Sequence, residues 1–151
     1  MSPNRLLIVD DEVAIGSLIA AAALGCGYDA HAMTDADSFK RQFLSFRPTL
    51  VALDLSMPGE DGIQLLRFLA ESECDAGILI VSGFDQRVIE CAASLGRGRG
   101  LRMLGTIPKP FRLGSLRELF NSLRHKDAEP AAAEPAAEAK PAAAKVARRR
   151  A

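Results

Sequence analysis

The sequence predicts an α/β fold in which a five-stranded parallel sheet carries helices on both faces. Short apolar runs alternate with amphipathic segments five times along the chain, and this alternation is typical of parallel sheets. Most of the runs are continuously apolar, which indicates strands buried on both faces. Each run also ends abruptly in a polar residue or a turn signal.

The composition is that of an ordinary globular protein. The chain has 151 residues, 48% hydrophobic and 25% charged, and its formal net charge is zero. This length suggests a domain with a sizeable core, and zero net charge gives no electrostatic reason to expect binding to membranes or nucleic acid. The longest apolar segment, 13–26, is shorter than the roughly 20 residues that span a bilayer, and no signal peptide is recognisable. We therefore expect a cytoplasmic protein.

The first half of the chain opens with two strand–helix units. An apolar run ends at Asp10, and glycines stop the Ala-rich helix that follows. The second helix is capped by Thr34 or Asp35, whose side-chain oxygens can accept a free backbone N–H. It ends before Pro48, because proline disfavours a helical conformation in the preceding residue. The expected elements are strands at 6–9 and 28–33 and helices at 13–24 and 35–46.

Three further units complete the predicted fold. Apolar runs lead to Asp54, Ser82 and Pro108, and apolar residues at helical spacing follow each run. The glycine-rich stretch 96–100 is expected to break the fourth helix. Pro108 fits an edge strand, because proline cannot donate a ladder hydrogen bond. The expected elements are strands at 50–53, 77–81 and 101–107 and helices at 61–69, 85–95 and 114–123.

Five such units favour the flavodoxin-like, doubly wound strand order 2-1-3-4-5. In this order the first and third strands flank the crevice in which open α/β sheets bind ligands. We therefore expect the polar residues at four strand ends to converge on one site. They are Asp10, Asp11, Asp54, Ser82 and Lys109.

The chemistry of this set is that of a phosphoryl site. Three converging carboxylates repel one another unless a hard cation lies among them, and Mg²⁺ binds carboxylates while keeping water or phosphate oxygens as other ligands. A carboxylate can also take up a phosphoryl group as a nucleophile. Mg²⁺, Lys109 and the Ser82 hydroxyl would then each meet one phosphoryl oxygen. The set therefore predicts a magnesium-dependent aspartyl phosphate.

The motifs around these residues resemble a known family. They are Val9-Asp10-Asp11-Glu12, the segment from Leu53 to Gly62, Val81-Ser82-Gly83 and Pro108-Lys109-Pro110-Phe111. From about Asn4 to Leu123 their order and spacing are similar to the receiver domains of bacterial response regulators in two-component signalling. A weaker similarity, carried by 82–85 and 104–109, is to receivers attached to EAL-type cyclic-di-GMP phosphodiesterases.

The resemblance implies roles for the acidic residues. Asp54 matches the phosphoacceptor. Asp10 and Asp11 match the acidic pair that binds Mg²⁺ together with Asp54 and the backbone carbonyl of Ser56. Glu12 is interpreted as favourable charge near a helix N-terminus rather than as a further metal ligand.

It also implies roles on the phosphoryl side of the site. Ser82 matches the switch hydroxyl, and Lys109 matches the phosphate-contacting lysine, whose bond to Pro110 is usually cis in the family. Two features depart from the family pattern. Thr106 stands where an aromatic switch partner is common, and the span from Ser82 to Lys109 is unusually long, for which we favour a longer fourth helix over a modified partner surface.

The implied function is a phosphorylatable signalling domain rather than an enzyme. A histidine kinase or a phosphotransfer protein would supply the phosphoryl group. An output protein would bind the face made by the fourth helix, fifth strand and fifth helix. We expect a receiver domain at 1–125 that acts as a stand-alone receiver, followed by a disordered tail rich in Ala, Pro, Glu, Lys and Arg at 126–151. We favour a solvated tail over nucleic-acid contact through its basic residues.

Two other functions stay open at this point. A haloacid-dehalogenase-like phosphatase also uses an Asp nucleophile and Mg²⁺, but its nucleophile lies in an Asp-x-Asp motif after the first strand, and Asp10 is followed by Asp11-Glu12. A receiver-like binding module that is not phosphorylated would not need the complete set of acids, hydroxyl and lysine.

Overall fold

The computed structural model describes residues 4–55, 57, 62–83 and 86–128. Its sheet has five parallel strands in the order β2-β1-β3-β4-β5, which confirms the predicted topology. The strands are β1 (Arg5–Val9), β2 (Asp29–Met33), β3 (Leu50–Asp54), β4 (Gly77–Ser82) and β5 (Arg102–Pro108). Each lies within one or two residues of the range expected from its apolar run.

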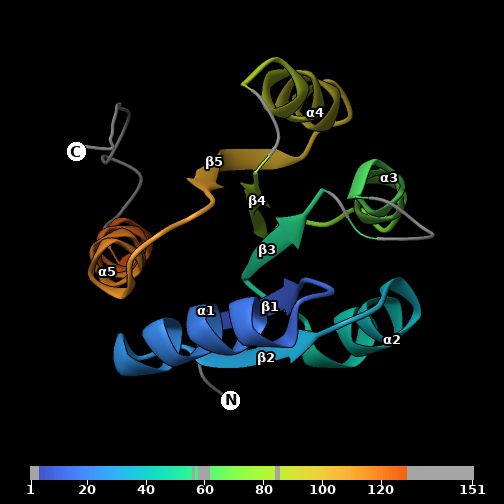
Figure 1. Ribbon diagram of the computed structural model, residues 1–151. Helices are drawn as coiled ribbons and strands as arrows, with labels where there is room; N and C mark the ends of the chain where they lie inside the picture. Colours follow the sequence, from blue (N-terminus) through green and yellow to red (C-terminus); the bar gives the residue numbers. More distant parts are fainter. Residues whose placement is uncertain (1–3, 56, 58–61, 84–85, 129–151) are drawn as a thin grey trace. The chain divides into compact units, whose positions relative to one another are not determined.

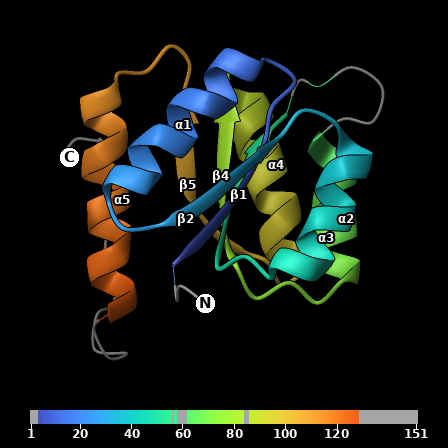
Figure 2. The same cartoon turned by 90° about the horizontal axis from the view of Figure 1, so that it is seen from below.

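Five helices connect and follow the strands (Figure 1). They are α1 (Val13–Gly25), α2 (Ala36–Phe46), α3 (Gly62–Glu71), α4 (Gln86–Gly98) and α5 (Leu113–Ala128). The chain divides into two compact units at Phe120, so that only residues 113–120 of α5 belong with the sheet. Within that unit, α1 and residues 113–120 lie on one side of the sheet, and α2, α3 and α4 lie on the other (Figure 2). Among the described residues, every helix is too short or too polar to span a bilayer.

The central strands are buried because both of their faces are covered. Every residue of β3 and β4 is buried, and so are Leu6 to Val9 of β1. On the side of α2, α3 and α4, the strand residues pack with helix residues such as Phe39, Leu65 and Ile89. On the opposite side Phe120 of α5 is fully buried and its ring lies 5.6 Å from that of Tyr28. This packing holds the strand ends, and the polar residues on them, in fixed positions.

Three signals act as the sequence predicts. Asp35 is the N-cap of α2, and its carboxylate accepts the backbone N–H of Ser38 at 2.8 Å. The helix ends at Phe46, where Arg47 takes up a left-handed conformation with φ of 54° before Pro48. β5 lies at the edge of the sheet, the place expected for a strand that contains Pro108.

The fourth helix ends within the glycine-rich stretch 96–100, as predicted, but three residues beyond the expected end at Leu95. α4 continues through Gly96 to Gly98, as the longer fourth helix that we favoured requires. Gly96 is buried, and a Cβ at this position would lie 2.5 Å from the sulfur of Met103. The glycine therefore permits close packing of α4 on β5 and does not end the helix.

β5 and α5 also differ from the expected pattern. The pairing of β5 with β4 shifts by one residue between Met103 and Gly105, and Gly105 has a φ of 155°. This irregularity leaves Leu104 half-exposed on an edge strand. α5 extends to Ala128, five residues beyond the predicted end at Leu123 and past the predicted domain boundary at 125. The rest of the predicted tail lies outside the described residues.

Candidate functional site

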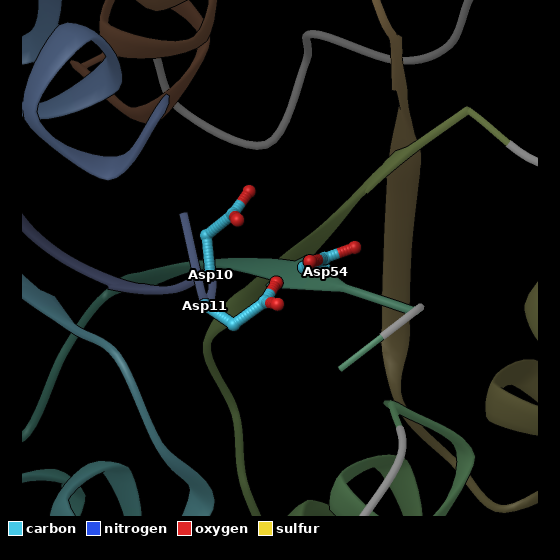
Figure 3. Close-up of side chains that lie close together, drawn as sticks. All are labelled: Asp10, Asp11 and Asp54. Atoms are coloured by element: carbon cyan, nitrogen blue, oxygen red, sulfur yellow. The ribbon is translucent and has the colours of Figure 1, made fainter. Parts of the chain in front are cut away.

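Three carboxylates meet at the carboxyl ends of two neighbouring central strands. Asp10 follows β1, Asp54 is the last residue of β3, and the two strands pair in parallel up to Val9 and Leu53. One carboxylate oxygen from each of Asp10, Asp11 and Asp54 lies within 4.8 Å of the others. Figure 3 shows the three side chains close together at the ends of their strands. Asp10 and Asp54 are buried, whereas Asp11 is exposed.

Lys109 brings a positive charge to this group from the end of β5. Its Nζ lies 3.1 Å from Asp10 Oδ2, 3.5 Å from Glu12 Oε1 and 3.7 Å from Asp54 Oδ2. The backbone N–H of Lys109 donates to the carbonyl of Ser82 at 3.1 Å, which ties the lysine to the end of β4. The peptide bond between Lys109 and Pro110 is cis.

The electrostatics of the site are strained by like charges. Burial raises the pKa of the Asp10 carboxyl above its ordinary value, and the negative charge of Asp54 adds to the rise. Desolvation and the neighbouring Asp54 also raise the pKa of Asp11. Burial alone would lower the pKa of Lys109, but the ion pair with Asp10 and the charges of Asp54 and Glu12 raise it overall.

This donor set fits a hard divalent cation. Three carboxylate oxygens within 4.8 Å of one another carry more negative charge than the single Lys109 ammonium can neutralise. Mg²⁺ is bound by such oxygens and retains positions for water or phosphate. Asp10, Asp11 and Asp54 are the described residues that could hold it.

Three other residues were predicted from the sequence to belong to the site: Ser82, Thr106 and Ser56. Ser82 is buried at the end of β4, one residue beyond the partner of Asp54 in the ladder. Thr106 is exposed in β5, paired with Ile80. Ser56 lies outside the described residues, so its carbonyl cannot be placed. Ser82 and Thr106 thus lie on the two neighbouring strands β4 and β5, and only Ser82 is at a strand end.

Sequence reasoning did not identify Gly62 as a residue of the site. A Cβ at this position would lie 2.7 Å from Leu55 Cα and 2.8 Å from the carbonyl oxygen of Asp54. Only a glycine allows α3 to begin this close to the backbone that carries Asp54. The available signal was the position of Gly62 at the start of a predicted helix, where a residue with better helix propensity would be expected.

Comparison with curated proteins gives bacterial regulatory proteins as relatives. The chain is 32% identical over 123 residues to the transcriptional regulatory protein TrcR of Mycobacterium tuberculosis, which covers 82% of this chain and 45% of the relative. It is 32% identical over 114 residues to the response regulator MprA of Mycolicibacterium vanbaalenii, covering 76% and 47%. The chain therefore spans less than half the length of either relative.

Solved structures agree with these matches. A response regulator from Colwellia psychrerythraea is 30% identical with a TM-score of 0.67, and the match covers 83% of this chain and 99% of that one. A receiver domain protein from Methanospirillum hungatei, described as CheY-like, has a TM-score of 0.68 at 20% identity over 82% and 92% of the two chains, and supports the fold alone. The family model of the response regulator receiver domain matches residues 6–121. With this match, and with the acidic group and the lysine at its strand ends, the chain belongs to the response regulator receiver domains.

Proposed function

We propose that this domain accepts a phosphoryl group on Asp54 from a histidine kinase or a phosphotransfer protein, in a magnesium-dependent reaction. Receiver domains are signalling domains that are phosphorylated in two-component systems. For this chain we propose Asp54 as the residue that is phosphorylated, and a histidine kinase or a phosphotransfer protein as the donor. The observation that carries it is the arrangement of Asp54, with two acidic neighbours within 4.8 Å and the Lys109 ammonium 3.7 Å away.

In the proposed transfer, a carboxylate oxygen of Asp54 attacks the phosphorus of a phosphohistidine. The P–N bond breaks, a P–O bond forms, and the imidazole of the donor leaves with the bonding electron pair. The Lys109 ammonium lies 3.7 Å from Asp54 Oδ2 and is the proposed partner of one equatorial phosphoryl oxygen, where charge neutralisation would lower the barrier. The buried hydroxyl of Ser82 is the proposed donor to a second oxygen.

Asp10, Asp11 and Asp54, with the Ser56 carbonyl as a further candidate, would hold Mg²⁺. When bound, Mg²⁺ neutralises charge on the phosphoryl oxygens and offsets the repulsion among the carboxylates. The protein's own contribution is to hold two of these carboxylates buried and in register, Asp10 by the N–H of Glu12 at 2.9 Å and Asp54 as the last residue of β3.

The proposed output is a contact with another protein through the face of α4, β5 and residues 113–120 of α5. Half-exposed Val88 and Leu104 lie on this face, and Thr106 is exposed beside them in β5. Relatives such as the transcriptional regulatory protein TrcR are longer than this chain, so the nature of the output is itself part of the proposal.

The deciding experiment is phosphorylation by a small-molecule donor. Incubation with acetyl phosphate and Mg²⁺ should add the mass of one phosphoryl group, and hydroxylamine should remove it. Asp54→Asn should abolish the addition. Asp37→Asn, the same change at an exposed residue of α2, should leave it intact, and chelation of Mg²⁺ should prevent it.

Two results would contradict the proposal. One is labelling that persists in Asp54→Asn, which would place the phosphoryl group elsewhere. The other is repeated hydrolysis of small phosphomonoesters without a stable acyl phosphate, which is the behaviour of a phosphatase of the haloacid-dehalogenase-like kind.

A further inference from the structure

Glu12 lies beside the three carboxylates of Asp10, Asp11 and Asp54 but is not one of that set. Its backbone N–H donates to Asp10 Oδ1 at 2.9 Å, and its carbonyl accepts the N–H groups of Ile15 and Gly16 at 3.1 Å. The residue is therefore held at the N-cap of α1. N-cap positions favour Ser, Thr, Asp and Asn, whose short side chains accept a free backbone N–H. The side chain of Glu12 makes no such hydrogen bond.

The Glu12 side chain instead reaches Lys109, 97 positions further along the chain, with Oε1 3.5 Å from Nζ. The two side chains differ in exposure, 63% for Glu12 and 17% for Lys109. Glu12 is outside the group of carboxylates whose oxygens lie within 4.8 Å of one another. Its contact in this structure is thus with the ammonium of the site.

The closest contact of Lys109 conflicts with cation binding. Its Nζ lies 3.1 Å from Asp10 Oδ2, and Asp10 is one of the three carboxylates that fit a divalent cation. A cation at Asp10 would repel the ammonium. A lysine that loses its closest partner regains side-chain freedom, because its four-carbon stem is flexible. Glu12 remains available as an anchor.

We propose that Glu12 is a positioning residue that holds the Lys109 ammonium at the site when a divalent cation engages Asp10. The inference rests on the proposed function, since it assumes that Mg²⁺ binds to this group of carboxylates. By taking over Lys109, Glu12 frees Asp10 for the cation and keeps the ammonium within reach of Asp54. Loss of the Glu12 charge should therefore weaken Mg²⁺ binding through Lys109.

The test is a double-mutant cycle on Mg²⁺ binding, measured by calorimetry with no phosphoryl donor present. Glu12→Gln should raise the Mg²⁺ dissociation constant by about two- to fivefold, the range expected for loss of one exposed ion pair. In a Lys109→Met background the same substitution should have a clearly smaller effect. Glu71→Gln, the same change at an exposed residue of α3, should leave the constant unchanged.

A second measurement follows the ammonium itself by ¹⁵N NMR of lysine side chains. The chain contains five lysines, and Lys109→Met assigns the signal of interest. With saturating Mg²⁺, the Lys109 ammonium should stay observable in the wild-type protein. It should broaden or vanish in Glu12→Gln, because the freed ammonium exchanges with water.

The outcomes separate the two proposals. If Glu12→Gln weakens Mg²⁺ binding equally with and without Lys109, the residue acts only through the field of its charge and the inference fails. An unchanged Lys109 signal in Glu12→Gln also overturns it. In both cases the acceptor role of Asp54 stands. If the wild-type protein binds no Mg²⁺, the proposed function fails as well.

Discussion

At the scale of single residues, Asp11 is the exposed member of the three carboxylates, while Asp10 and Asp54 are buried. Desolvation, followed by the neighbouring Asp54, raises the pKa of Asp11 above its ordinary value of 3.8. A carboxyl whose pKa is higher in the folded state binds more protons there than in the unfolded state. Its contribution to stability is therefore lost as the pH rises through the folded-state pKa.

We predict that Asp11→Asn raises the free energy of unfolding at neutral pH in magnesium-free buffer, because it removes a charge that the folded state disfavours. The gain should shrink as the pH is lowered toward 3.8, the ordinary pKa of the group, where the wild-type carboxyl becomes protonated. Urea unfolding across this pH range measures the effect. Added Mg²⁺ should reverse the order, stabilising the wild-type protein more than the variant.

A matched change at Asp37 should have the opposite sign. This carboxylate lies in the first turn of α2, where a negative charge is favourable. Asp37→Asn should lower the free energy of unfolding by about 0.3–1 kcal/mol. A loss of stability in Asp11→Asn as well would show that the three carboxylates do not oppose folding.

At the scale of elements, the packing of α4 on β5 depends on one glycine. A Cβ at Gly96 would lie 2.5 Å from the sulfur and 3.1 Å from Cγ of Met103. We predict that Gly96→Ala lowers the free energy of unfolding by about 1 kcal/mol, since the methionine must move and overpacking outweighs the gain in helix propensity. Thermal or urea unfolding measures the change.

Because the added Cβ would meet Met103, a second substitution at Met103 tests whether this contact causes the loss of stability. Gly96→Ala should cost less in a Met103→Ala background, with a coupling of about 0.5–1 kcal/mol between residues in contact. Gly98→Ala is the matched control, because a Cβ there meets nothing within 4 Å. Equal costs for Gly96→Ala in both backgrounds would mean that Met103 is not the obstacle.

The elements also show which parts of the molecule could be predicted from the sequence. Asp54 and Ser82 could be placed at strand ends because a short apolar run followed by a polar residue is a local signal. The exact end of α4 within the stretch 96–100 could not, because the close fit of Gly96 against Met103 in the next strand leaves no local signal. The contact of Glu12 with Lys109 joins residues 97 positions apart, and no local pattern predicts it.

At the scale of the whole molecule, we propose that the fold is complete by the end of α5 and that the predicted tail adds nothing to it. Truncation after Ala128 should leave the thermal midpoint and Mg²⁺ binding unchanged, because residues 129–151 are rich in Ala and Pro and contain no aromatic residue. Calorimetry measures both quantities on the same samples.

Phe120→Ala is the contrasting variant. It removes a fully buried ring that packs against Tyr28 and should cost about 3–5 kcal/mol. A truncated chain that unfolds as readily as Phe120→Ala would assign the tail a part in the fold.

Gly62 has a mechanical consequence. The start of α3 is so close to the backbone of Asp54 and Leu55 that only the hydrogen atom of a glycine fits between them. The end of β3 and the start of α3 are therefore in direct backbone contact. Any displacement of the Asp54 backbone toward α3 must move that helix as well. α3 also contacts α4. A displacement of Asp54 can thus reach α4 through the Gly62 contact and α3. This path does not depend on the hydroxyl of Ser82 or on an aromatic side chain at position 106.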